Sequence, residues 1–153
     1  MKTEFVEFDY TFLKLSSTWL SDPEIKKLTL TPDIDCKEQK KWFDSLKTRN
    51  DYYIQGVCVD GIPVGAVGIK NINYSKNEGE YWGYIGEKKY IGHGIGNLMI
   101  DEMCRVAKNK LLDSLYLHVA CYNERAYKLY LKNGFVESDS SDGIILMRKN
   151  ISM

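Results

Sequence analysis

The order of apolar and polar residues predicts three neighbouring strands in the middle of the chain. Apolar residues dominate 52–59 and 63–72, and Asp60 and Gly61 lie between these two runs. Because glycine readily takes a positive φ, this pair predicts the tight turn of an antiparallel hairpin. The β-patterned aromatic run 79–86 then predicts a third strand in succession.

After this run the apolar residues recur every three or four positions, which predicts a helix with one buried face. The residues of that face are Ile95, Leu98, Met99, Met103, Val106 and Leu111. Alternation returns at 115–119 and indicates another strand. A strand that follows a crossover helix in the same sheet runs parallel to the strand before it, so 79–119 is expected to form a βαβ unit.

The remaining segments complete a single domain over residues 1–153. The predicted elements are a strand around Phe5–Phe8, helices at 13–20 and 35–46 with turns at 22–23 and 31–33 between them, a helix at 123–133, and strands at 135–137 and 144–148. Asn123 is suited to cap the last helix and Gly134 to end it. We expect an α/β (α+β) fold, with a mixed, mostly antiparallel sheet of six or seven strands flanked by about four helices.

Composition narrows the possible partners. With 153 residues and 44% hydrophobic content, the chain can bury a core without disulfides or a metal. Lys plus Arg and Asp plus Glu number 21 each, which disfavours nucleic acid and anionic membranes as partners. The four cysteines form no Cys-x-x-Cys pair, and no apolar run is long enough to span a bilayer. We therefore expect a cytoplasmic, metal-free monomer or homodimer.

Three alternating glycines, Gly92, Gly94 and Gly96, join the third strand to the long helix. The first amides of a helix have no internal acceptor, and the aligned peptide dipoles add positive potential there. Glycines let a phosphate approach such amides closely, so the junction predicts a phosphate cradle. A flexible turn is the alternative interpretation, because short glycine motifs often occur by chance.

Two common nucleotide loops fit this junction poorly. A P-loop ends in Gly-Lys-Ser or Gly-Lys-Thr, whereas Gly96 is followed by Asn97 and Leu98. A dinucleotide-binding fold places its glycines after an early strand, whereas an antiparallel hairpin comes first here. An ATPase is thereby excluded, and a dinucleotide enzyme is disfavoured.

The chain from Tyr52 onward resembles the GCN5-related N-acetyltransferase (GNAT) superfamily. Its acetyl-CoA pyrophosphate loop has Arg or Gln, two residues, Gly, one residue, and Gly or Ala, and this pattern falls on Ile91, Gly94 and Gly96. The segment 123–135 is similar to the superfamily's Asn-x-x-Ala, Tyr, Gly-Phe signature. Ile91 departs from the pattern, so the resemblance implies that acetyl-CoA is held here chiefly by backbone amides.

The resemblance also implies particular residues for the acetyl-CoA site. They are Tyr84, Ile85, Gly86, Ile91, Gly92, His93, Gly94, Ile95, Gly96, Asn97, Asn123 and Tyr127. The strand before the loop is expected to splay from its neighbour, so that the backbone groups of 84–86 hold the pantetheine arm and the thioester carbonyl. His93 is assigned to a CoA phosphate, with simple solvation as the alternative.

Catalytic residues follow from the same resemblance. Tyr130 matches the tyrosine that protonates the departing CoA sulfur, and Tyr127 is its less favoured substitute. Glu80 matches an acidic position that relays a proton from the amine through water, and an exposed structural carboxylate is the competing interpretation. His118 ranks below Glu80 as a candidate base.

The acceptor is expected to be a primary amine of a small molecule, acetylated by direct attack. The segments 19–25 and 39–43 resemble the branch that contains amino-sugar and ribosomal-protein N-terminal acetyltransferases. An amino sugar or nucleotide-linked amino sugar is the first expectation, and a protein N-terminal amine is the second. A non-catalytic acyl-CoA sensor or a small interaction module is the alternative of a different class.

Overall fold

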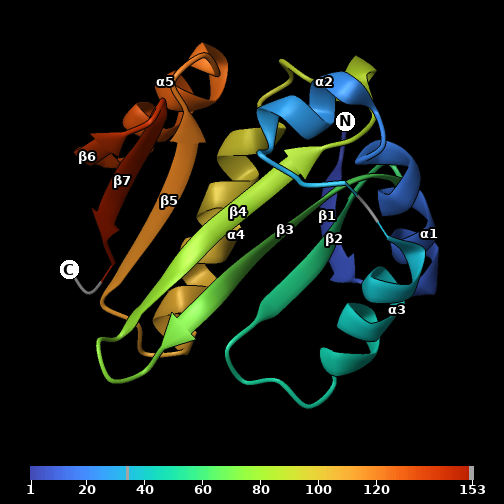
Figure 1. Ribbon diagram of the computed structural model, residues 1–153, viewed down its shortest axis with the longest axis horizontal. Helices are drawn as coiled ribbons and strands as arrows, with labels where there is room; N and C mark the ends of the chain where they lie inside the picture. The colour runs from blue at the N-terminus through green and yellow to red at the C-terminus, as the bar shows by residue number, and fades with distance from the viewer. Residues whose placement is uncertain (34, 152–153) are drawn as a thin grey trace.

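One mixed sheet of seven strands forms the centre of the molecule (Figure 1). The computed structural model describes residues 1–33 and 35–151. The strands are β1 (Thr3–Glu7), β2 (Tyr53–Val59), β3 (Ile62–Asn73), β4 (Glu78–Ile85), β5 (Ser114–Ala120), β6 (Val136–Ser141) and β7 (Ile144–Asn150). Their order in the sheet is β1-β2-β3-β4-β5-β7-β6. All neighbours are antiparallel except β4 and β5, which confirms the predicted βαβ unit.

Helices cover both faces of this sheet. They are α1 (Tyr10–Trp19), α2 (Pro23–Leu28), α3 (Cys36–Ser45), α4 (Ile95–Asn109) and α5 (Glu124–Lys132), with a 3-10 turn η1 (Lys88–Tyr90). Figure 1 shows α4 behind the sheet, with α1 and α3 at the β1–β3 side. Each face has its own buried cluster, one around α4 and one around Phe8, Phe12 and Trp19.

The helix α2 corrects the turn that was expected at 22–23. The Asp22 carboxylate accepts hydrogen bonds from the amides of Glu24 and Ile25, at 2.9 and 3.2 Å. Pro23 occupies the first turn, where its missing N–H is not needed. Asp-Pro is therefore a helix start here, and the described residues contain five α-helices rather than about four.

For two residues of the predicted buried face of α4, the prediction that the side chain is buried is wrong. Leu98 is 45% exposed because it lies on the flank of the helix, away from the stripe formed by Ile95, Met99 and Met103. Leu111 is 80% exposed because α4 has already ended. Its left-handed φ of 61° turns the chain, so that the next residue, Leu112, enters the core in its place.

The two parallel strands separate along their length. β4 pairs with β5 only at 78–80 against 114–116, although the strands continue to Ile85 and Ala120. Figure 1 shows the two ribbons diverging beyond this point. The splay implied by the family resemblance is thus present, and it leaves one side of the upper half of β4 without a ladder partner in the described structure.

Gly68 on β3 leaves room for the Trp82 ring to approach the strand backbone. A Cβ at Gly68 would come within 2.4 Å of the Tyr53 carbonyl oxygen and 2.8 Å of the Trp82 ring. We expect Gly68→Ala to lower the free energy of unfolding by about 1–3 kcal/mol, measured by urea denaturation. Gly96→Ala is the control, because there the near atom is a flexible Leu129 methyl. A Gly68→Ala protein as stable as wild type would contradict this packing.

Candidate active site

A cavity of about 850 Å³ opens between the diverging strands. This volume lies within the range of small-molecule binding sites. Four structural groups line it: Ile91 and Gly96 of the glycine loop with Met99 on α4, the face of α5 that contains Tyr130, the β4–β5 face that contains Glu80 and His118, and the α1–α3 segment. The cavity therefore brings together the predicted cofactor loop and both predicted catalytic residues.

The glycine loop presents free backbone donors at the start of α4. Gly92 and Gly94 have φ of 86° and 82°, and Gly94 caps the helix in the left-handed conformation. Among the described residues, no amide from Gly92 to Asn97 donates a hydrogen bond. A row of free amides at a helix start can bind an anion such as a pyrophosphate by donating hydrogen bonds to it. The free amides at the start of α4 thus fit the phosphates of acetyl-CoA.

The third glycine and two side chains of the loop have other roles. A Cβ at Gly96 would come within 2.7 Å of Leu129, so this glycine permits α4 to pack closely on α5. The His93 ring nitrogen lies 3.1 Å from the Lys89 carbonyl oxygen, which directs the ring toward η1. The Asn97 side chain accepts from Asn133 at 2.8 Å. His93 and Asn97 do not line the cavity with their side chains.

The backbone of β4 offers fewer free groups than the sequence analysis assigned. The amide of Gly86 donates to the Val64 carbonyl at 2.7 Å and is occupied. Peptide groups of a strand alternate in direction, so the groups of Tyr84 also face β3, whereas those of Ile85 and Gly83 face the splayed side. Ile85 is thus well placed for the pantetheine arm. Gly83 is an addition that only the strand register could identify.

Tyr130 lies in the cavity with its hydroxyl group free. Its ring packs edge-on against Tyr81 and Phe135, with centroid distances of 6.1 and 5.9 Å. Burial raises the pKa of Tyr130 to about 12, because the phenolate would be poorly solvated. No described residue accepts from or donates to its oxygen. The phenol is therefore protonated at neutral pH and able to donate to a ligand.

Tyr127 and Asn123 are placed differently. The Tyr127 hydroxyl donates to the Glu137 carboxylate at 2.9 Å, on β6, and this residue does not line the cavity. Asn123 lines the cavity, but its side chain caps Ala126 and donates to the Leu28 carbonyl, each at 3.3 Å. Asn123 therefore ties α5 to α2 across the top of the cleft.

Glu80 is a buried carboxylate with two side-chain partners. It is 9% exposed, which differs from the exposed strand carboxylate that was the competing interpretation. His118 Nδ1 lies 2.9 Å from Glu80 Oε2, and Asn71 donates to Oε1 at 3.0 Å. Asn71 stands at an irregularity in the β3–β4 register with φ of 51°, and such bulges often redirect a side chain. The sequence alone did not indicate Asn71.

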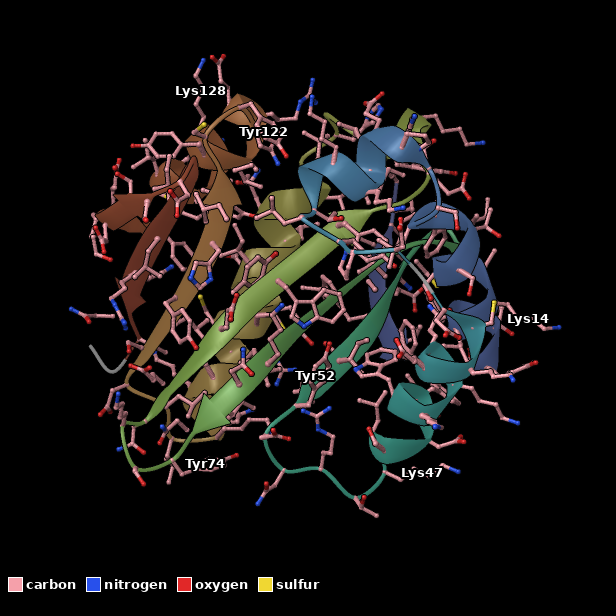
Figure 2. The ribbon with its side chains drawn as sticks, in the orientation of Figure 1. Lys14, Lys47, Tyr52, Tyr74, Tyr122 and Lys128 are labelled. Carbon is pink, nitrogen blue, oxygen red and sulfur yellow. The ribbon has the colours of Figure 1, made fainter. Side chains whose placement is uncertain are left out.

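Aromatic rings form one wall of the cavity. We call Trp42, Tyr52 and Trp82 the aromatic wall. Trp42 meets Tyr52 edge-on at 5.7 Å between centroids, and Tyr52 meets Trp82 at 6.2 Å. Figure 2 shows Tyr52 on the sheet face flanked by α3. The Trp82 indole N–H is buried and has no acceptor among the described residues.

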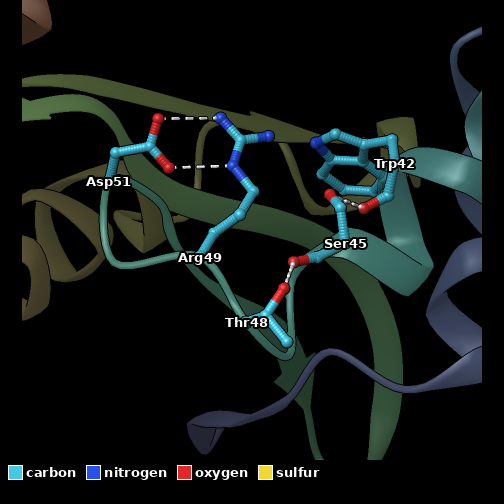
Figure 3. A network of polar contacts seen from close by, with 5 residues as sticks. All are labelled: Trp42, Ser45, Thr48, Arg49 and Asp51. Carbon is cyan, nitrogen blue, oxygen red and sulfur yellow. Dashed lines mark hydrogen bonds and ion pairs between the residues drawn. The ribbon is translucent and has the colours of Figure 1, made fainter.

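The loop between α3 and β2 fixes this wall (Figure 3). Arg49 makes two parallel hydrogen bonds to Asp51, at 2.8 and 3.1 Å, and its guanidinium also lies 5.0 Å from the centre of the Tyr52 ring. The Ser45 hydroxyl donates to the Trp42 carbonyl at 2.6 Å. The guanidinium beside Asp51 lowers the pKa of that carboxyl, so the ion pair persists at neutral pH.

Other kinds of site find little support. Within the described ranges, no group of three or more His, Cys, Asp or Glu side chains could hold a metal. The four cysteines are free thiols, and none lines the cavity. In the part of the chain that the structure covers, no helix has the length and apolar character required to cross a membrane.

Solved structures of several N-acetyltransferases share this fold. Spermidine N-acetyltransferase from Vibrio cholerae, solved with CoA and spermine, is 21% identical over 98% of this chain and 96% of that chain, with a TM-score of 0.87. PaiA N-acetyltransferase from Thermoplasma acidophilum, solved with coenzyme A, is 19% identical over 98% and 99%, with a TM-score of 0.77. The N-acetyltransferase PseH from Campylobacter jejuni is 20% identical over 97% and 96%, with a TM-score of 0.73.

The family assignment comes from the sequence. No curated protein matches this chain at a significant level. The model of the acetyltransferase (GNAT) family matches residues 16–135, which is well over half of the chain. This range contains the glycine loop, Glu80 and Tyr130. The chain therefore belongs to the acetyltransferase (GNAT) family and is an N-acetyltransferase that uses acetyl-CoA.

Proposed function

We propose that the protein acetylates the primary amine of an amino sugar or a nucleotide-linked amino sugar by direct transfer. Acetyl-CoA supplies the acetyl thioester, and its sulfur leaves as a thiol when the amide forms. No cysteine of the described chain lines the cavity, which supports attack by the amine itself rather than through an acetylated enzyme.

The aromatic wall is the observation that carries this choice, and within it the buried Trp82 N–H has no acceptor among the described residues. Leaving a buried donor without an acceptor costs about 1–3 kcal/mol, so an acceptor atom on the substrate would stabilise the complex. Flat aromatic rings beside a fixed donor suit a ring that carries hydroxyl groups, because the apolar ring face stacks while an oxygen accepts. An amino sugar or its nucleotide-linked form has these features.

The Glu80–His118 pair is suited to take up the amine proton. If Glu80 accepts from His118 Nδ1, the other ring nitrogen is left as an acceptor, and the His118 side chain is 44% exposed. The carboxylate then orients the ring and stabilises it once it is protonated. Tyr130, which lines the same cavity, donates to the departing sulfur.

A polyamine is the second candidate acceptor. Four carboxylates of the α2–α3 segment line the same cavity and could attract a cationic chain: Glu24, Asp33, Asp35 and Glu38. Three of them already have partners, because Glu24 lies 3.5 Å from Lys88, Asp33 pairs with Lys26, and Asp35 accepts the amide of Lys37. The acidic contribution available to a polyamine is therefore smaller than the number of carboxylates indicates.

Thiol release from acetyl-CoA tests the proposal with an amine panel. The panel contains glucosamine, a nucleotide-linked amino sugar, spermidine and a peptide with a free N-terminus. We expect the sugars to give the highest kcat/KM, and Trp82→Phe to raise their KM about tenfold while the KM of acetyl-CoA stays constant. Preference for spermidine, with no effect of Trp82→Phe, would select the second candidate. CoA binding without turnover of any amine would favour a sensor.

A further inference from the structure

Arg125 faces the glycine loop from the first turn of α5. Its Nη1 atom lies 3.4 Å from the position that a Cβ on Gly92 would occupy. Together with Ile91, it lines both the large cavity and the smaller cavity beside it. The guanidinium and Gly96, whose amide is free, thus border the same large cavity, although Arg125 lies well beyond Gly96 along the chain.

This guanidinium has no partner in the described structure. It takes part in no ion pair or hydrogen bond there, whereas the nearby Lys88 lies 3.0 Å from Asp22 and 3.5 Å from Glu24. A cation in the first turn of a helix also opposes the helix dipole, which favours negative charge at that end. Only Glu124 adds an acidic group to that turn. Although Glu24 and Glu124 line the smaller cavity with Arg125, neither forms an ion pair with it in the described structure, so the guanidinium is available to an incoming anion.

Ile91 leaves the glycine loop without the polar side chain that the family pattern places beside the pyrophosphate. It occupies the place where the pyrophosphate-loop pattern has an arginine or glutamine, and its side chain can form neither an ion pair nor a hydrogen bond. Taking acetyl-CoA as the donor, we propose that Arg125 supplies from α5 the side-chain contact to the pyrophosphate that position 91 lacks. A guanidinium can pair with two phosphate oxygens at once, which suits a diphosphate held against backbone amides.

Calorimetric titration of CoA tests this role without depending on turnover. We expect Arg125→Ala to weaken CoA binding about ten- to a hundredfold, the effect of losing a charge-assisted hydrogen bond. Lys128→Ala is the matched control, because it removes the same charge from α5 at a side chain that projects outward and does not line the cavity (Figure 2). This variant is expected to bind CoA as the wild type does.

Two further titrations identify which phosphate group Arg125 contacts. Ile91→Arg in the Arg125→Ala background should restore much of the affinity, since both side chains would serve the same phosphates. The Arg125→Ala substitution should weaken the binding of dephospho-CoA as much as it weakens the binding of CoA, because dephospho-CoA retains the pyrophosphate. A loss confined to CoA would assign Arg125 to the 3′-phosphate and overturn the proposal.

The remaining outcomes separate this proposal from the proposed function. Equal CoA affinity in the wild type and in Arg125→Ala would overturn the role of Arg125 alone. A wild-type protein that failed to bind CoA would instead overturn the use of acetyl-CoA as donor. Thermal unfolding of each variant, expected to match the wild type because Arg125 is exposed, confirms that binding is compared between folded proteins.

Discussion

Tyr130→Phe is expected to slow acetyl transfer roughly ten- to a thousandfold at saturating acetyl-CoA. The substitution keeps the ring, whose edge-on contacts with Tyr81 and Phe135 hold it in place, and removes only the hydroxyl. Because no described residue uses that hydroxyl, its loss should change neither folding nor CoA affinity. The measurement is kcat from thiol release, beside a calorimetric titration of CoA.

Tyr127→Phe is the matched control on the same helix. It also deletes one phenolic oxygen, but that oxygen donates to Glu137 outside the cavity. We expect its kcat to equal that of the wild type. A Tyr130→Phe enzyme with undiminished kcat would show that the general acid is another group. A slow Tyr127→Phe enzyme would point to the alternative that sequence analysis ranked lower.

Glu80→Gln is expected to lower kcat/KM for the amine roughly a hundredfold or more. Glutamine preserves the shape and can still meet Asn71, but it removes the negative charge that stabilises protonated His118. The pH–rate profile of the variant should therefore differ from that of the wild type. Full pH–rate profiles for both proteins provide the measurement.

Glu78→Gln is the control for the removal of a carboxylate from β4. Glu78 lies two residues earlier on the same strand face and pairs with Arg148 at 3.3 Å, away from the cavity. The pH–rate profile of Glu78→Gln should match that of the wild type. His118→Gln should resemble Glu80→Gln, and the double variant should be little worse than either, since the two residues act as a unit. An unchanged Glu80→Gln profile would remove Glu80 from catalysis.

Local chemistry explains why much of the fold was predictable. Asp60 and Gly61 indicated the β2–β3 turn, and the three- and four-residue spacing after Gly94 indicated α4, because each signal depends on near neighbours. The predicted ends of the helices were wrong where a local sequence signal is compatible with two structures. Asp22-Pro23 serves turns and helix starts equally well, and the periodicity of α4 did not show that the helix would end before Leu111.

The candidate site was predictable only in part, for the same reason. The free amides of the glycine loop and the placement of Tyr130 in the cavity follow from two short motifs. The Glu80–His118 contact joins residues 38 positions apart on neighbouring strands. It depends on the register of β4 against β5, which no periodicity reveals.

The sequence by itself determined the family, the order of most elements and the glycine loop with its free amides, because these depend on residue type and short spacing. The tertiary structure alone decided which groups meet: Asn71 and His118 with Glu80, the Trp82 ring with Gly68, and Arg125 with Gly92. These contacts form where strands splay and helix ends converge, and such geometry is set by packing across the whole sheet rather than by neighbours along the chain.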